Sequence, residues 1–86
     1  MLRSRSSITD GFPLAFLREG EEGEIIGVRC GWGLAQRLAD MGFIPSTRVK
    51  MISANSRGPV LVEIRGSRIA LGRGVAMKII VNGVRE

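Results

Sequence analysis

The middle of the chain, residues 31–45, constrains the fold most, because it places one short amphipathic helix among segments that otherwise have the pattern of strands. Leu34, Leu38 and Met41 are spaced at i, i+4 and i+7 and therefore share one helix face. Gly42 follows them directly, as a typical left-handed helix stop, and the proline three residues further on prevents the helix from resuming. A strand, a lone helix and then several short strands is an uncommon order for a small domain.

The segments that flank this helix predict a half-buried strand on each side. Residues 24–30 alternate between apolar and other residues, with Ile26, Val28 and Cys30 on the face that we expect to be inner. Residues 47–53 predict a second strand directly after the helix.

Three more strands are predicted in the second half of the chain. A two-residue turn of Gly66 and Ser67, with glycine first, is typical of a type II′ hairpin and separates the third strand from the fourth. Glycines at 72 and 74 interrupt the chain before the closing strand. The apolar residues that define these strands are Val60, Val62, Ile64, Ile69, Leu71, Met77, Ile79 and Val81.

Five short strands joined by tight turns predict a small barrel, because closure removes the exposed edges of an open sheet. A short helical turn is expected near the start of the domain, with Pro13 in its first position and Leu14 and Leu17 against the core. We expect a disordered leader over residues 1–11, one domain over 12–82 and a tail over 83–86. The predicted core contains Ile26, Val28, Leu38, Val60, Val62, Ile64, Leu71 and Ile79.

The residue types present argue against an enzyme. The chain has no histidine, no tyrosine and a single cysteine, so neither a cysteine–histidine dyad nor a serine–histidine–aspartate triad can form. Cys30 is expected to be a small core residue. The glycines around Arg73 resemble half of a phosphate-binding loop, but a strand rather than a helix is expected to follow them. No catalytic residue and no cofactor is assigned.

The charge balance favours acidic partners. Thirteen lysines and arginines against eight aspartates and glutamates give a formal net charge of +5. These basic residues are scattered, which is most often the pattern of a solvated surface. No apolar run approaches the about 18–20 residues that span a bilayer, and the first twenty residues lack the apolar core of a signal peptide. We therefore expect a cytoplasmic protein.

A set of short segments spread over residues 12–82 has the pattern of a known family. The most specific one, residues 41–47, reads Met-Gly-Phe-Ile-Pro-Ser-Thr. Together the segments resemble FeoA, the small cytoplasmic component of the bacterial ferrous-iron uptake system. The stretches that carry the resemblance are 17–23, 34–47, 59–62, 66–71 and 76–81.

The resemblance implies a mainly β fold: a small SH3-like β-barrel of about five strands, with one inserted short α-helix and an N-terminal helical turn. It implies a non-enzymatic accessory role in ferrous-iron transport, beside FeoB, a membrane permease with a cytoplasmic GTPase domain. It also implies a connection with transition-metal binding. Without histidine and with only Cys30, the chain is assigned no metal ligand.

The helix and its entry form the predicted partner surface. The helix is the only element inserted into an otherwise minimal barrel, so its outer face is not needed to close the core. Trp32 offers a rigid aromatic anchor and Arg37 a charge for an acidic partner. The turn that carries Arg73 is expected to lie beside them. Trp32, which stands between two glycines, has the alternative of packing as a cap on the barrel.

Two other functions stay open from the residues alone. A small basic nucleic-acid-binding barrel would need aromatic residues on its sheet surface for base stacking, and the predicted strand faces carry none. A weak metal-binding protein would use the carboxylates of Glu19, Glu21, Glu22 and Glu24, although a solvated turn explains these carboxylates better. We expect no nucleic-acid partner, no insertion into a membrane, and a monomer or weak homo-oligomer.

Overall fold

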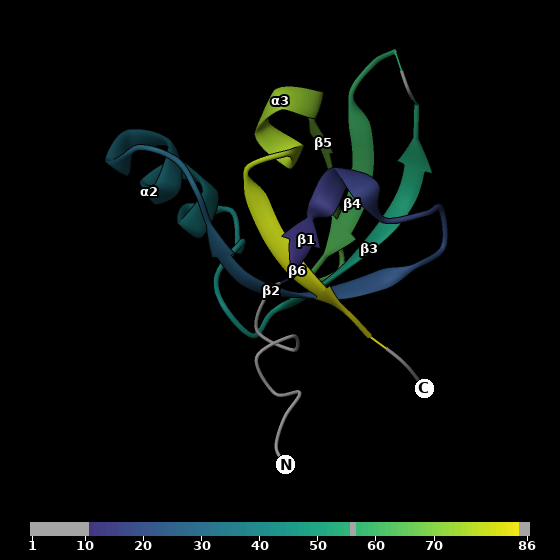
Figure 1. Cartoon of the computed structure of the whole chain (residues 1–86), viewed down its shortest axis with the longest axis horizontal. Coiled ribbons are helices and arrows are strands. Elements are labelled where there is room, and N and C mark those ends of the chain that lie inside the picture. Colours follow the sequence, from purple (N-terminus) through teal and green to yellow (C-terminus); the bar gives the residue numbers. More distant parts are fainter. Residues whose placement is uncertain (1–10, 56, 85–86) are drawn as a thin grey trace.

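A computed structural model of the chain describes residues 11–55 and 57–84, and most of the expected leader lies outside them. One antiparallel sheet dominates it, with six strands in the order β1-β6-β2-β3-β4-β5 (Figure 1). The elements are β1 (Phe12–Pro13), the 3-10 turn η1 (Leu14–Phe16), β2 (Glu22–Val28), α2 (Trp32–Asp40), β3 (Arg48–Ala54), β4 (Val60–Ile64), β5 (Ser67–Leu71), α3 (Arg73–Ala76) and β6 (Ile79–Gly83).

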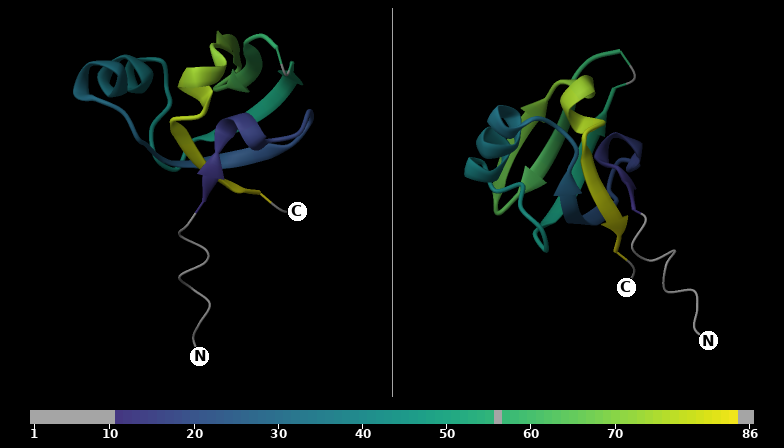
Figure 2. Two further views of the ribbon diagram at one scale, coloured as in Figure 1. Left: turned by 45° about the horizontal axis from the view of Figure 1, so that its top comes forward. Right: turned by 60° about the vertical axis from the view of Figure 1, so that its left-hand side comes forward.

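The sheet bends round on itself, and η1 and α3 lie over its concave side (Figure 2). In both views of that figure α2 lies to one side of the sheet, within the long connection between β2 and β3. The mainly β architecture with one inserted helix is the predicted one. The structure adds the two-residue strand β1, which pairs with β6 through Phe12 and Val81.

One apolar core fills the inside of the bent sheet. Six of the eight predicted core residues are buried, Val28 is half-buried against them, and the prediction for Ile26 was wrong. Leu14, in η1, and Leu17, directly after it, are buried in the core, as expected. Cys30 is half-buried and packs against the core, also as expected. The buried hydrophobic residues are Leu14, Ala15, Leu17, Ile25, Leu38, Phe43, Val49, Met51, Val60, Val62, Ile64, Leu71, Ala76, Ile79, Ile80 and Val81.

A bulge in β2 explains the error at Ile26. The register of β2 against β6 shifts between Ile25 and Gly27, so the strand does not keep a two-residue period through its length. Before the shift Ile25 points into the core and is 1% exposed, whereas Ile26 is only half-buried. After it Val28 again packs against the core. A simple two-residue alternation therefore predicted Ile26 in the core, whereas Ile25 is the buried isoleucine.

The turn between β4 and β5 lies one residue earlier than predicted. Ile64 pairs with Ser67, which leaves Arg65 and Gly66 as the two loop residues. Both have positive φ, 52° and 84°, which is the type I′ conformation and not the predicted type II′. Arginine rarely adopts a positive φ, so the sequence pattern predicted Gly66 and Ser67, and not Arg65 and Gly66, as the two turn residues.

The cap at the end of α2 seats this helix on the barrel. Gly42, with φ of 104°, donates its N–H to the Ala39 carbonyl, and Phe43 donates to the Leu38 carbonyl at 2.9 Å. This is the Schellman pattern, in which a hydrophobic contact accompanies the two hydrogen bonds. Leu38 and Phe43 are both buried in the core. Met41, which shares a helix face with Leu34 and Leu38 by its spacing, stands at the C-cap and is 41% exposed.

Two short helical turns differ from the predictions. Pro13 stands directly before η1 with an extended conformation, and it does not occupy the first helical position. One turn of helix, α3, follows Gly72 where a strand was expected. Met77, predicted to belong to the closing strand, instead ends α3 and is 40% exposed.

We expect Leu38→Ala to lower the free energy of unfolding by roughly 2–5 kcal/mol, because Leu38 is the one α2 residue that is fully buried. A urea titration measures the change. Arg37→Ala, on the exposed neighbouring position, is the control and should change it by less than about 0.5 kcal/mol. An equally small change in Leu38→Ala would show that α2 does not pack on the barrel.

Gly42→Ala should destabilise by about 1–2 kcal/mol, because its φ of 104° disfavours any Cβ. The added Cβ would also lie 3.1 Å from Cδ of Arg65. Gly33→Ala is the matched control: it lies within α2 with open space around its Cβ position, so it should be neutral or stabilising by up to about 1 kcal/mol. Equal effects of the two substitutions in thermal unfolding would contradict the cap.

Candidate protein-interaction surface

The helix α2 projects from the barrel, and Trp32 begins it (Figure 1). The Trp32 residue is 81% exposed, so it does not cap the barrel. Gly31 caps the helix in an extended conformation and has no side chain that could accept a capping hydrogen bond, and the glycine after Trp32 has open space around it. A large aromatic side chain is thus held in solvent at the first position of a helix.

Trp32 and Arg37 lie on different sides of α2. At about 100° per residue, five positions turn the helix so that the two side chains point about 140° apart. Gln36 and Asp40 lie between these directions, and the Gln36 amide donates to the Asp40 carboxylate at 3.3 Å. One flat partner surface therefore cannot contact Trp32 and Arg37 equally; a partner that wraps the helix can.

Apolar side chains are exposed around α2 beyond Trp32. In the described ranges, five large hydrophobic residues are well exposed, and three of them belong to α2 or to the chain that follows it. Met41 and Ile44, 41% and 38% exposed, form this group with Trp32, while Phe16 lies on η1 and Met77 at the end of α3. Exposed tryptophan and methionine are enriched at the centres of protein interfaces.

Arg73 lies apart from the other two predicted contact residues. Its guanidinium donates to the Asn55 carbonyl in the β3–β4 loop. This loop and α2 lie on opposite sides of the molecule in all three ribbon views (Figures 1 and 2). The residue is half-buried, and Nε of Arg73 is buried without a hydrogen-bond partner among the residues that the structure describes. Arg73 therefore fastens a loop in this structure.

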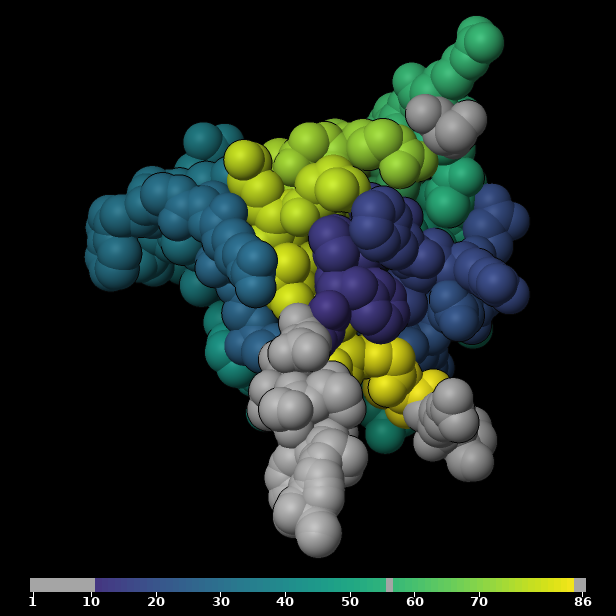
Figure 3. Space-filling view, in the orientation of Figure 1, coloured from purple at the N-terminus to yellow at the C-terminus, as the bar shows by residue number. Residues whose placement is uncertain are grey.

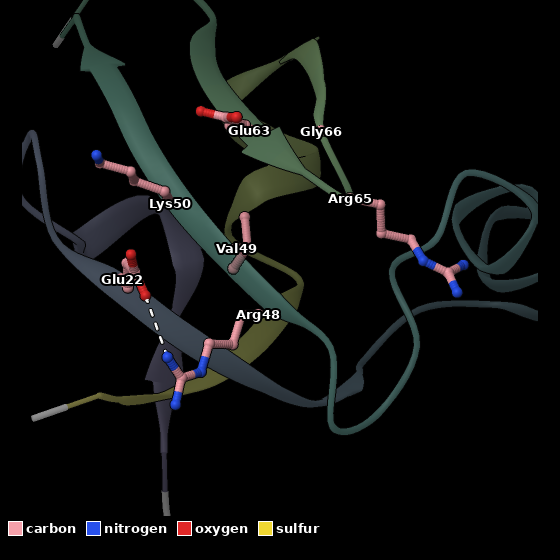
Figure 4. A pocket seen from close by; sticks show the side chains of 7 residues that line it. All are labelled: Glu22, Arg48, Val49, Lys50, Glu63, Arg65 and Gly66. Atoms are coloured by element: carbon pink, nitrogen blue, oxygen red, sulfur yellow. Dashed lines mark ion pairs between the residues drawn. The ribbon is translucent and has the colours of Figure 1, made fainter.

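Arg65, which sequence reasoning did not single out, lies at the end of α2 instead. Its side chain extends from the β4–β5 turn toward α2 and away from Glu63 (Figure 4). A Cβ on Gly42 would lie 3.1 Å from Cδ of Arg65, which places the stem of the arginine across the helix cap. A cation at the carboxyl end of a helix is favourable for the helix dipole. Only the unexpected turn conformation, invisible in the sequence, brings it there.

The outer face of β2–β4 is a shallow depression whose charges are mixed (Figure 4). Arg48 and Glu22 form an ion pair at 3.6 Å, and both are exposed to solvent. Lys50 lies opposite Glu22 on β2 and opposite Glu63 on β4. An exposed pair of this kind contributes little to stability, and the alternation of charges selects no particular ligand.

The carboxylates near the start of β2 are used in local contacts. Glu21 accepts a hydrogen bond from the Arg18 N–H at 2.6 Å, and Glu19 accepts one from the Ala54 N–H at 3.1 Å. Within residues 11–55 and 57–84, no three His, Cys, Asp or Glu side chains are grouped so that they could hold a metal ion. The same ranges contain no helix that is long and apolar enough to cross a membrane.

Solved structures place the fold in the SH3-like class. The chain superposes on a crystal structure of an iron uptake regulatory protein, FeoA, with a TM-score of 0.79 and 26% identity, over 84% of this chain and 96% of that one. It also superposes on the Stenotrophomonas maltophilia FeoA complexed with zinc, described as a procaryotic SH3 domain protein, with a TM-score of 0.73 and 24% identity, over 81% and 88% of the two chains. The predicted SH3-like barrel is confirmed.

Sequence comparison then identifies the family. Residues 12–83 match the FeoA domain. A protein of Methanocaldococcus jannaschii named "Putative Fe(2+) transport protein A" is 47% identical over 70 residues, which cover 81% of this chain and 84% of that protein. The chain belongs to the FeoA family, as its resemblance suggested.

Arg73→Glu should lower the free energy of unfolding by about 1–3 kcal/mol, because it removes the hydrogen bond to Asn55 and puts a carboxylate at a half-buried position. Arg37→Glu makes the same charge change on an exposed helix face and should cost less than about 0.5 kcal/mol. Chemical denaturation measures both. Equal stability of the two variants would show that Arg73 is a free surface residue.

Proposed function

We propose that this chain is a non-enzymatic accessory protein of ferrous-iron transport that acts by binding the cytoplasmic part of a FeoB-like permease. Family membership supports the connection with ferrous-iron transport. The observation that supports binding is the exposed apolar group on α2, with Trp32 81% exposed at its start. An exposed tryptophan on a projecting helix is a costly feature for a protein that works alone.

The proposed contact surface consists of Trp32, Arg37, Met41 and Ile44, which lie on α2 and just after it. Arg73, predicted as a third contact from the sequence, would join this surface only through a partner large enough to reach the β3–β4 loop. Because a helix that protrudes can be gripped from several sides, a partner groove accommodates Trp32 and Arg37 together. We place this encounter in the cytoplasm, with the chain acting as a monomer or weak homo-oligomer.

A protein partner suits this surface better than a nucleic acid does. In the described part of the chain, the exposed aromatic residues are Phe16 on η1 and Trp32 on α2, and neither lies on a strand. Barrels that bind single-stranded nucleic acids stack bases on aromatic residues of the sheet. The outer sheet face here carries mixed charges instead.

Trp32→Ala should weaken binding to the purified cytoplasmic part of the permease by about tenfold or more, as truncation of an interface tryptophan does. Calorimetric titration measures the dissociation constant. Phe16→Ala removes another exposed aromatic residue, 61% exposed and away from α2, and should change binding by less than about twofold. Undiminished binding by a folded Trp32→Ala variant would place the surface elsewhere, and no binding by the unaltered chain would refute the proposed function.

A further inference from the structure

Two basic side chains are held next to one another where β2 ends and β6 begins. Val28 pairs with Ile79, and just beyond this last pair of the two strands the Arg29 N–H donates to the Lys78 carbonyl at 2.7 Å, so Arg29 and Lys78 are neighbours across the strand ends. Both are exposed. Like charges at neighbouring positions of this kind repel each other and are destabilising.

No acidic side chain of the described residues is paired with these two cations. The one ion pair found there joins Arg48 and Glu22, at the opposite end of β2. The chain around the pair is also free of acids, since residues 25–39 and 64–84 contain neither aspartate nor glutamate. The same two stretches carry six basic residues, which are Arg29, Arg37, Arg65, Arg68, Arg73 and Lys78.

Most of the acidic residues in the described ranges lie elsewhere, and Asp40, the last residue of α2, is the exception. Four of the glutamates fall within residues 19–24, and Glu63 lies on β4 opposite Lys50. The charge along β2 is thus uneven, with glutamates near its start and the two cations where β2 ends and β6 begins. In the space-filling view, the blue chain that leads from β2 to α2 lies directly beside the yellow-green chain that leads from α3 into β6 (Figure 3).

Exposed apolar residues stand close to the two basic residues along the chain. Trp32 follows Arg29 after two residues and is 81% exposed, and Met77 directly precedes Lys78 and is 40% exposed. The two connections therefore carry two positive charges together with an aromatic ring and a flexible thioether. Arginine, tryptophan and methionine are the residues that interfaces enrich, and the interface must supply the missing negative charge.

We propose that Arg29 and Lys78, with Trp32 and Met77 beside them, form a receptor for an acidic protein segment that carries a carboxylate next to an apolar side chain. The carboxylate lies between the two cations and relieves their repulsion, while the apolar side chain covers Trp32. The main-chain hydrogen bond holds the two backbone positions next to each other, so that both side chains can reach one carboxylate, which suits a discrete acidic group more than a diffuse anionic surface. The proposal rests on the proposed function for the identity of the partner, and not for the chemistry of the site.

Trp32 is the single tryptophan of the chain and reports directly on this site. We would titrate the full-length chain with a synthetic peptide of alternating glutamate and leucine and follow tryptophan emission. The expected result is a shift to shorter wavelength and weaker quenching by acrylamide. Raising the salt from about 50 to about 300 mM should weaken binding severalfold, because exposed charges are screened beyond a Debye length.

The double variant Arg29→Glu with Lys78→Glu should bind the acidic peptide about tenfold more weakly or worse, because two attractions become two repulsions. Arg18→Glu with Arg57→Glu is the matched control: it makes the same change in net charge at two exposed positions away from the pair, and should alter binding by less than about twofold. Both variants keep Trp32, and circular dichroism checks that both remain folded. Equal loss in the two double variants would overturn the proposal.

Two further probes separate other anionic partners from an acidic segment. Vesicles that contain phosphatidylglycerol, or a short single-stranded RNA, would overturn the proposal if they shift the emission of Trp32 at lower concentrations than the acidic peptide does. A parallel titration with the cytoplasmic part of the permease separates the two claims. If the chain binds the peptide but not the permease, only the proposed function is refuted. If the Arg29→Glu, Lys78→Glu double variant binds the permease as well as the unaltered chain does, only the proposed receptor is refuted.

Discussion

The contact between Leu38 and Phe43 is the interaction on which the arrangement of α2 depends. The helix is nine residues long and has one fully buried side chain, Leu38. Isolated helices of this length are not stable in water, so α2 exists because of its contact with the barrel. The two hydrogen bonds of the cap at Gly42 and Phe43 bring the chain back under the helix and bury Phe43 beside Leu38. A helix held from one end can leave its other end, with Trp32, in solvent.

Much of the barrel could be predicted from the sequence because its signals are local. Val60, Val62 and Ile64 alternate without interruption and lie in the core, and Gly42 after an apolar stripe marked the end of α2. The errors occurred where one backbone conformation overrides the pattern. A bulge after Ile25 reverses the phase of β2, and a positive φ at Arg65 shifts the turn by one residue. Neither feature leaves a distinctive residue type behind.

The candidate surface was less predictable than the fold, because it depends on distances between segments far apart in the chain. Trp32 between glycines allowed both packing and exposure and slightly favoured packing, whereas the residue is 81% exposed at the far end of α2. Arg73 was assigned beside the helix from the order of the barrel, whereas its guanidinium reaches Asn55. The pair of Arg29 and Lys78 is 49 residues apart in sequence and adjacent in space, through one register of β2 and β6.

A small domain of this kind has little stability with which to hold repelling charges together, since a chain of about this size buries only roughly 60–65% of its unfolded surface. The distribution of charged residues over the domain therefore bears on what the domain binds. Acidic residues beside Arg29 or Lys78 would remove the repulsion at no cost to the core, because both positions are exposed. The chain instead keeps four of its glutamates near the start of β2 and leaves Arg29 and Lys78, at the end of that strand and the start of β6, without an acidic partner among the described residues. That separation matches a domain whose electrostatic complement is another molecule, and a ligand that supplies the missing negative charge would stabilise the folded chain.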